Sequence, residues 1–188
     1  MVRDTEGNDF FYPNGIAKLR LEGYGNVNGY IHKDNPDYLN AAINSNSLLE
    51  KHFQKSTTQL HTHSPQSMRV DLLNELEELF LSSFNKTRSN KFRSEDDIAV
   101  TGYLYHHYAL LSGNAIQSNT RTELIQQNHG FTKKFNRLLN LKRRNMLNKL
   151  PLSICINDGA DSHLNRDWNN SVNSFLNDFF PKKCEFEK

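Results

Sequence analysis

The chain has 188 residues, of which 36% are hydrophobic, 11% aromatic and 23% charged. This length suits one domain with a real hydrophobic core, and the 12 Phe exclude a wholly disordered chain. The 23 Lys and Arg nearly balance the 21 Asp and Glu, so a net charge of +2 excludes nucleic acid as a partner bound through bulk charge. No apolar run approaches the ~20 residues of a membrane span.

The cysteine count and the first residues of the chain predict a cytoplasmic protein. Cys155 and Cys184 are too few for a disulfide framework or a zinc knuckle. Residues 1–6 lack the apolar segment of a signal peptide. We therefore expect a reducing compartment, in which disulfides are rare.

The N-terminal part of the chain is rich in turn formers and contains a candidate strand. Residues 18–22 alternate polar and apolar side chains, which is typical of a half-buried strand. The glycines of residues 23–29 are spaced one residue wider than in the dinucleotide-binding fingerprint, and no strand leads into a helix there. We interpret this segment as an ordinary Gly-rich loop.

Three helices are predicted in the middle of the chain. The first covers about 35–53 and begins with an Asn-Pro pair, an N-cap followed by Pro at the first helical position. The second begins in a similar way at residues 64–65. The third begins at Ser94, where residues 94–97 form a capping box, and Gly113 marks its end.

The C-terminal part combines helices with a strand. A helical region of about 121–150 is interrupted near residues 128–130. Residues 152–156 are apolar and rich in β-branched side chains, which predicts a buried strand. The last helix carries apolar side chains at helical spacing from Trp168 to Phe179. A buried strand needs partners, so we expect an α/β fold in which part of a larger sheet is missing.

Two segments carry residues that are suited to bind phosphate. His61 and His63 lie two positions apart, so in an extended segment they share a face and could both reach a metal ion or a phosphate. His63 is also next to a predicted helix start, whose N–H groups suit an anion. Two exposed loop histidines are the alternative. Arg93 likewise precedes a helix start, with a solvated surface arginine as the alternative. Asp97 is explained more simply as the acid of the capping box.

Asn157 and Asp158 follow the predicted strand near the C-terminus. Ligands of open α/β sheets gather at the carboxyl ends of strands, and these oxygens suit a hard divalent cation or a sugar hydroxyl. A plain Asn-Asp-Gly turn is the alternative.

Two other polar segments favour structural explanations. His106 and His107 are adjacent in a predicted helix and point about 100° apart, so we expect a packed polar–aromatic surface and no shared metal. Residues 133–149 carry seven Lys and Arg with no acid between them. We interpret them as a solvated helix face, with contact to an anionic polymer or membrane as the alternative.

Several stretches of the chain occur in an order that matches a known family. They are residues 63–65 with the apolar helix after them, residues 91–113 from Lys-Phe-Arg-Ser to the Tyr-rich helix, and residues 154–187 from Ile-Cys-Ile-Asn-Asp to the closing Phe-Glu. Residues 10–15 are similar to the end of a preceding block. With these stretches the chain resembles the Stealth family of sugar-phosphate transferases, which includes bacterial capsular polysaccharide phosphotransferases. Lys91 stands where that family has Arg.

The resemblance implies an α/β fold, the helix-rich C-terminal part of a Rossmann-like nucleotide-sugar transferase core with an incomplete sheet. Residues 1–188 would form the C-terminal portion of a single domain of this type. The family's opening strand motif and its Asn-Asp-Asp segment do not occur before Phe10. We therefore expect the N-terminal portion to be absent, which places independent activity of the chain in question.

The family transfers a hexose-1-phosphate from a UDP-sugar to an acceptor hydroxyl and releases UMP. The resemblance implies a UDP-N-acetylhexosamine donor and a capsular polysaccharide acceptor. His63 would accept the hydroxyl proton, and Arg93 would stabilise charge on the phosphoryl oxygens. Asp97 would orient Arg93 or bind the donor. Asn157 and Asp158 would bind the donor diphosphate or a divalent metal ion, Mg²⁺ or Mn²⁺.

The expected partners include other capsule assembly proteins and no nucleic acid. A cytoplasmic location is expected, with peripheral attachment to the inner face of the cytoplasmic membrane as the alternative. Two other functions stay open. One is a glycosyltransferase that releases UDP, against which the lack of an Asp-x-Asp metal motif argues. The other is a non-catalytic module that binds anionic carbohydrate through residues 133–149.

Overall fold

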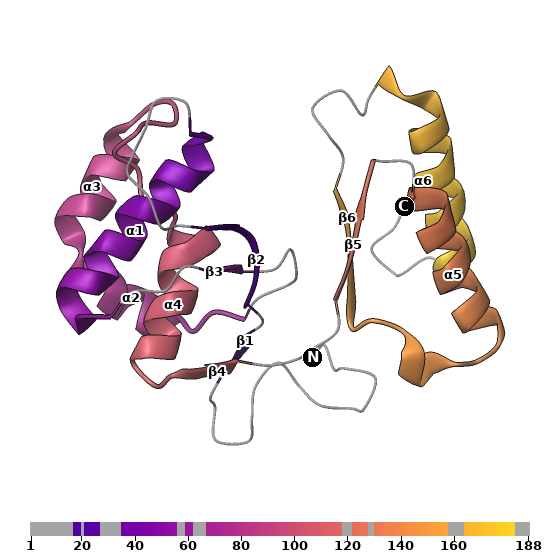
Figure 1. The fold of residues 1–188 in the computed structure, drawn as a ribbon, viewed down its shortest axis with the longest axis horizontal. Helices are drawn as coiled ribbons and strands as arrows, with labels where there is room; N and C mark the ends of the chain where they lie inside the picture. Colours follow the sequence, from indigo (N-terminus) through magenta and orange to yellow (C-terminus); the bar gives the residue numbers. More distant parts are fainter. Residues whose placement is uncertain are drawn as a thin grey trace. The chain divides into compact units, whose positions relative to one another are not determined.

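The computed structural model describes most of the chain in two compact units (Figure 1). One unit lies within residues 9–120 and the other within residues 121–188. The described residues are 17–19, 21–26, 35–55, 59–61, 67–117, 122–127, 130–157 and 164–182. His63, Asp158 and Cys184 lie outside these ranges, so the predictions made for them stay predictions.

The first unit combines helices with two strand pairs. In chain order its elements are β1 (Ala17–Leu19), β2 (Leu21–Asn26), α1 (Asp37–Phe53), β3 (Gln59–His61), α2 (Val70–Leu79), α3 (Leu81–Ser89), the π-helical turn η1 (Val100–Leu104), α4 (Tyr105–Leu111) and β4 (Ala115–Gln117). β1 pairs with β4 in parallel, whereas β2 and β3 are antiparallel. Gly23 and Gly25 therefore lie in a strand, and the Gly-rich loop predicted there is wrong at these positions.

The first two predicted helices exist, but both begin later than expected. Pro36 has a ψ of 139°, outside the helical range, and its carbonyl accepts a hydrogen bond from the N–H of Leu39 at 2.8 Å. Pro36 is therefore the N-cap of α1 and not its first helical residue. α2 begins at Val70 instead of residues 64–65, since residues 67–69 have no helical structure.

The helix predicted to begin at Ser94 does not begin there. The segment after Ser94 makes a turn, and helical structure begins only with η1. The N–H of Ile98 donates to Thr87 Oγ1 at 3.0 Å, and the N–H of Ala99 donates to Ser45 Oγ at 2.9 Å. These acceptors on α3 and α1 replace the carbonyls four residues earlier that a helix would use. Tertiary contacts thus override the capping-box pattern.

The core of the first unit is centred on α4 and η1. His106 and His107 are 1% and 0% exposed, so the surface location predicted for them is wrong. The His107 ring centroid lies 4.0 Å from that of Tyr103, and His106 Nε2 lies 2.7 Å from the Thr101 carbonyl oxygen. Side chains from α1, α2 and α3 complete this core, among them Leu49, Leu72, Leu76 and Phe84.

The second unit is built on a parallel strand pair. In chain order its elements are β5 (Thr122–Gln126), α5 (Phe131–Arg143), the 3₁₀ turn η2 (Leu147–Lys149), β6 (Ser153–Asn157) and α6 (Arg166–Phe179). The helix predicted from about 121 is wrong over β5, which pairs with β6. The strand predicted at 152–156 is confirmed as β6, but its residues are half-buried. Each described sheet has two strands, as expected for an α/β fold with an incomplete sheet.

α5 and α6 lie beside β5 and β6 (Figure 1). Aromatic side chains of the two helices fill the core between these elements. The rings of Phe135 and Phe175 stack with centroids 4.4 Å apart. The Trp168 ring meets the Phe131 ring edge-on at 4.9 Å. The apolar stripe predicted from Trp168 to Phe179 is therefore confirmed for Trp168, Val172, Phe175 and Phe179, which lie in the core. It is wrong for Leu176, which is 38% exposed.

A single side-chain cap begins α6, and its removal is expected to destabilise the second unit. Asn165 Oδ1 accepts a hydrogen bond from the N–H of Trp168 at 3.0 Å. Asn165→Ala is expected to lower the free energy of unfolding by about 1 kcal/mol, because that amide loses its acceptor. Urea unfolding followed by the fluorescence of the single Trp measures the change. Asn170→Ala, on the exposed side of α6, is the matched control, and equal destabilisation by both variants would contradict the capping role.

Ionisation of Tyr108 is expected to lower the stability of the first unit at alkaline pH. Its hydroxyl donates to Glu75 Oε1 at 2.5 Å, and burial, together with this contact, raises the pKa of Tyr108 to about 12. The folded state favours the neutral phenol, so its contribution is complete below about pH 10 and is lost as the pH rises through about 12. Between about pH 10 and about pH 12, Tyr108→Phe is therefore expected to lose less free energy of unfolding than the parent chain. Thermal unfolding across the interval tests this, and parallel losses in both proteins would refute it.

Candidate functional site

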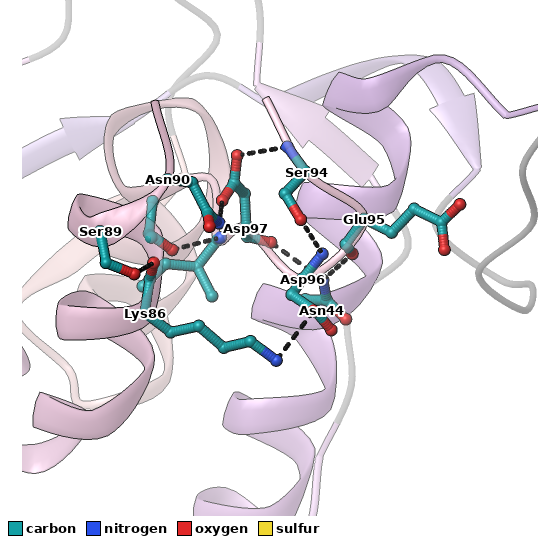
Figure 2. Close-up of polar contacts among 10 residues, drawn as sticks. Asn44, Lys86, Ser89, Asn90, Ser94, Glu95, Asp96 and Asp97 are labelled. Carbon is teal, nitrogen blue, oxygen red and sulfur yellow. Dashed lines mark hydrogen bonds and ion pairs between the residues drawn. The ribbon is translucent and has the colours of Figure 1, made fainter. Parts of the chain in front are cut away.

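A loop between α3 and η1, residues 90–99, is fastened to α1 (Figure 2). The side-chain amide of Asn44 donates to the carbonyl oxygens of Glu95 at 2.7 Å and of Asp97 at 2.9 Å. Ser45, the next residue of α1, accepts the hydrogen bond from Ala99 described above. Two adjacent polar side chains of α1 thus hold the second half of the loop.

Asp97 organises the same loop from within (Figure 2). Its Oδ1 accepts a hydrogen bond from Asn90 Nδ2 at 2.7 Å, and its Oδ2 accepts one from the N–H of Ser94 at 2.9 Å. The bond from the N–H of Ser94 to the Asp97 carboxylate is one of the two hydrogen bonds of a capping box, and it forms here without a helix. On the outside of the loop, Lys86 of α3 makes an exposed ion pair of 2.8 Å with Asp96.

Arg93 is exposed on this loop beside two other exposed side chains. Phe92 is 78% exposed, and the Lys91 ammonium lies 5.5 Å from the centroid of its ring. Among the described residues, no hydrogen bond or ion pair joins Arg93 to Asp97. The contacts of Asp97 therefore support a role in shaping the loop that carries Arg93.

Arg93 and Asp97 line the same surface pocket, which has a volume of about 320 Å³. The structure thus brings two of the predicted site residues together. The other walls come from the start of α1, from α3 and from the segment that leads into η1. They include Asp37, Tyr38, Thr87, Val100, Thr101 and Gly102.

The pocket combines a guanidinium group with the start of a helical segment. Its lining includes Arg93 and the first residues of η1, which continues directly into α4. The first N–H groups of a helix have no acceptor within it and carry partial positive charge. Asp37 and Asp97 add carboxylates to the walls. A phosphate bound at Arg93, with a hydroxyl or cation near the carboxylates, fits this distribution of charge.

The π-helical turn η1 connects the pocket to a second predicted site segment. Such turns occur frequently at functional sites. η1 lies next to β3, which ends at His61. His63 follows two residues later in the sequence and lies outside the described residues. β3, the strand that precedes His63 in the sequence, therefore lies beside a segment that lines the pocket.

Asn157 lies in the second unit, at the carboxyl end of β6. Because β5 and β6 are parallel, Gln126 and Asn157 end at the same edge of the strand pair. The carboxyl edges of parallel strands are where α/β folds bind ligands. An open depression of about 500 Å³, lined by residues 164–167, lies at the start of α6. Arg93 belongs to the first unit, so the two predicted positions lie in separate units.

The basic stretch that covers α5 and η2 is partly paired within the second unit. Arg137 and Lys134 lie 2.6 and 3.9 Å from the carboxylate of Glu123. Arg143 lies 3.6 Å from a carboxylate oxygen of Asp178. These ion pairs favour the predicted helix face over a surface for an anionic polymer, since they use some of its basic groups locally.

Metal binding stays a prediction. Among the residues that the structure describes, no three His, Cys, Asp or Glu side chains gather in a way that could hold a metal ion. Of the predicted ligand pair, Asn157 is described and Asp158 is not. None of the described helices is both long and apolar enough to cross a membrane.

Sequence patterns do not point to Asn44, Asp37 or Tyr38 as site residues. All three belong to α1, far from Arg93 along the chain. Only Asp37 has a local signal, an acidic side chain in the first turn of a helix, and that signal indicates helix stability. Their relation to the pocket exists only in the folded chain.

Part of the chain matches a conserved region of a known family. Residues 62–111 match Stealth protein CR3, conserved region 3. This region includes His63, the loop with Arg93 and Asp97, and η1 with α4. The pocket therefore lies largely within the matched region.

Curated relatives match over a greater length. The chain is 63% identical over 188 residues to capsular polysaccharide phosphotransferase SacB of Neisseria meningitidis serogroup A, which is 100% of this chain and 34% of the relative. It is 30% identical over 188 residues to exopolysaccharide phosphotransferase CpsY of Mycobacterium leprae, covering 99% and 34%. An exopolysaccharide phosphotransferase of Nocardia farcinica is 36% identical over 115 residues, covering 61% and 23%. The chain thus spans 34% of the length of the first two relatives. Together these matches show that the chain belongs to the Stealth family.

Proposed function

We propose that the chain is part of a capsular polysaccharide phosphotransferase that transfers a hexose-1-phosphate from a UDP-sugar to a sugar hydroxyl. The observation that carries this proposal is the 63% identity with SacB over all 188 residues. The pocket with Arg93 inside the matched conserved region adds support. A UDP-N-acetylhexosamine is the proposed donor, and a capsular polysaccharide is the proposed acceptor.

In the proposed reaction the acceptor hydroxyl oxygen attacks the phosphorus atom that is bonded to the sugar. A new P–O bond forms, the bond from that phosphorus to the bridging oxygen breaks, and UMP leaves with the bridging oxygen. The hydroxyl proton passes to a base, for which we propose His63, because an imidazole titrates near neutral pH. The product is a phosphodiester between two sugars.

Arg93 is the proposed ligand of the donor phosphates. A guanidinium group can bind two phosphoryl oxygens at once, and the neighbouring N–H groups at the start of η1 add partial positive charge. Phosphoryl transfer depends mainly on positioning and on stabilising charge at the phosphoryl oxygens. Asp97 supports this role by fixing the shape of the loop on which Arg93 lies.

A divalent metal ion, Mg²⁺ or Mn²⁺, is the proposed cofactor, with Asn157 and Asp158 as its ligands or as donor-binding residues. Amide and carboxylate oxygens are ligands that these hard cations prefer, and Asn157 ends a parallel strand, so the donor set fits. When bound, the ion would neutralise charge on the donor diphosphate.

The proposed location is the cytoplasm, with peripheral contact at the inner face of the cytoplasmic membrane. This location follows from the proposed donor, which is a soluble nucleotide sugar. Other capsule assembly proteins are the proposed partners, because a capsular acceptor must be delivered to the enzyme.

Arg93→Ala is expected to weaken the binding of inorganic pyrophosphate, which stands for the donor diphosphate. The loss of charge-assisted hydrogen bonds should lower the affinity about tenfold or more. Isothermal titration of the full chain at constant ionic strength measures the affinity. Arg144→Ala, which removes an exposed arginine of the second unit, is the matched control. An equal loss in both variants would show that pyrophosphate responds to net charge only.

The nucleotide product tests the reaction itself. The full chain, and a SacB variant whose matching segment is replaced by this chain, are incubated with UDP-N-acetylhexosamines, a capsular acceptor and Mg²⁺, with and without EDTA. We expect acceptor-dependent, EDTA-sensitive UMP from the chimera. UDP would indicate a glycosyltransferase instead, and no nucleotide release from either protein would overturn the proposal.

Two substitutions in the chimera separate the proposed roles from the fold. His63→Ala and Arg93→Ala are each expected to lower turnover about a hundredfold or more, because they remove the base and the phosphate ligand. Circular dichroism should show unchanged helix content. Full activity of either variant would refute the role assigned to that residue.

A further inference from the structure

We infer that Asn44 is a positioning residue that holds the loop of residues 90–99, and with it Arg93, at the pocket. The inference rests on the proposed function, in which Arg93 binds the donor phosphates. Asn44 lies on α1, outside the matched conserved region of residues 62–111. Its side chain acts on the loop backbone, so it would influence phosphate binding only through the loop.

The contacts of Asn44 span the turn that follows Arg93 (Figure 2). One side-chain nitrogen donates to the carbonyl oxygen of Glu95 at 2.7 Å and to that of Asp97 at 2.9 Å. The two acceptors lie on either side of Asp96, so a single amide group holds the backbone on both sides of the turn. Asparagine provides two N–H donors on a short side chain, which suits this task.

The loop depends on this contact because the hydrogen bonds that Asp97 makes within the loop, to Asn90 and Ser94, hold loop residues to one another and do not join them to α1. Within the turn, the N–H of Asp97 donates to the carbonyl oxygen of Ser94 at 3.1 Å. The far end is anchored separately, through Ile98 and Ala99 on acceptors from α3 and α1. Loss of the Asn44 contacts would therefore release mainly the turn of residues 94–97, which directly follows Arg93.

The same contact joins the loop to α1, which also lines the pocket. The start of α1 contributes Asp37, Tyr38 and Ala41 to the lining, and Asn44 follows Ala41 by less than one helical turn. Arg93 lies on the loop wall. By joining the loop to α1, Asn44 fixes the distance between Arg93 and the α1 residues that line the same pocket.

We call the two hydrogen bonds from Asn44 to the carbonyls of Glu95 and Asp97 the clamp. Backbone amide exchange in the full chain tests the clamp without any ligand. Asn44→Ala is expected to speed the exchange of the hydrogen-bonded amides of Ser94 and Asp97 about tenfold, because two hydrogen bonds that order the turn are lost. Asn44→Asp, of the same shape, should act at least as strongly, since a carboxylate would face two carbonyl oxygens. Ser47→Ala is the matched control on α1, since the Ser47 hydroxyl donates to the Ile43 carbonyl.

Kinetics in the SacB chimera then test the consequence for the site. Asn44→Ala should raise the KM for the UDP-sugar about three- to tenfold and change kcat less, because Arg93 spends less time in place. Its melting temperature should match that of Ser47→Ala, which separates positioning from a general loss of stability. Asn44→Asp should raise the KM at least as much.

The outcomes distinguish this inference from the proposed function. Unchanged exchange at Ser94 and Asp97 in both Asn44 variants would overturn the clamp, whatever the activity. Faster exchange together with an unchanged KM would overturn the link from Asn44 to Arg93. If Arg93→Ala itself leaves turnover intact, the proposed function fails, while faster exchange in the Asn44 variants would still establish the clamp.

Discussion

The hydrogen bonds from Asn44 and Ser45 of α1 to the loop before η1 are the contacts on which the candidate site depends. Ser45 is fully buried, donates to the Ala41 carbonyl at 2.7 Å and accepts from the N–H of Ala99 at 2.9 Å. Asn44 satisfies two loop carbonyls in the same region. A buried polar group such as the Ser45 hydroxyl is costly unless it is paired, and here it bonds to both the helix and the loop. The loop therefore has one favourable arrangement without being part of a helix or strand.

The same helix also determines where the π-helical turn lies. The Tyr103 hydroxyl donates to Asn46 Oδ1 at 3.1 Å inside the core, so three consecutive residues of α1 carry polar contacts to the segment of residues 95–103. A helix with a purely apolar inner face could bury the same area, but it would not specify the position of this backbone. We regard these three polar side chains as the feature that gives the pocket a defined shape.

The family match and the structure emphasise different parts of the site. The conserved region of residues 62–111 contains His63, Arg93 and the helical segment after the loop, but not α1. The pocket takes one wall from α1 and another from the loop. A description based on the motif alone would therefore contain the phosphate-binding candidate and leave out the helix that positions it. Asn157 stands apart in the second unit, at the end of a parallel strand pair.

The sequence by itself determined the features that are set by short-range rules: the beginning of α1 near the Asn-Pro pair, the end of α4 before Gly113 with its positive φ of 77°, and the apolar stripe of α6. It also singled out Arg93 and Asp97, which do share a pocket. Only the tertiary structure decided that β5 is a strand and that no helix begins at Ser94. In both places the backbone amides and carbonyls find partners far away in the sequence, as do those that Asn44 and Ser45 satisfy. Local patterns describe what a segment can form alone, whereas these distant hydrogen bonds select among the possibilities.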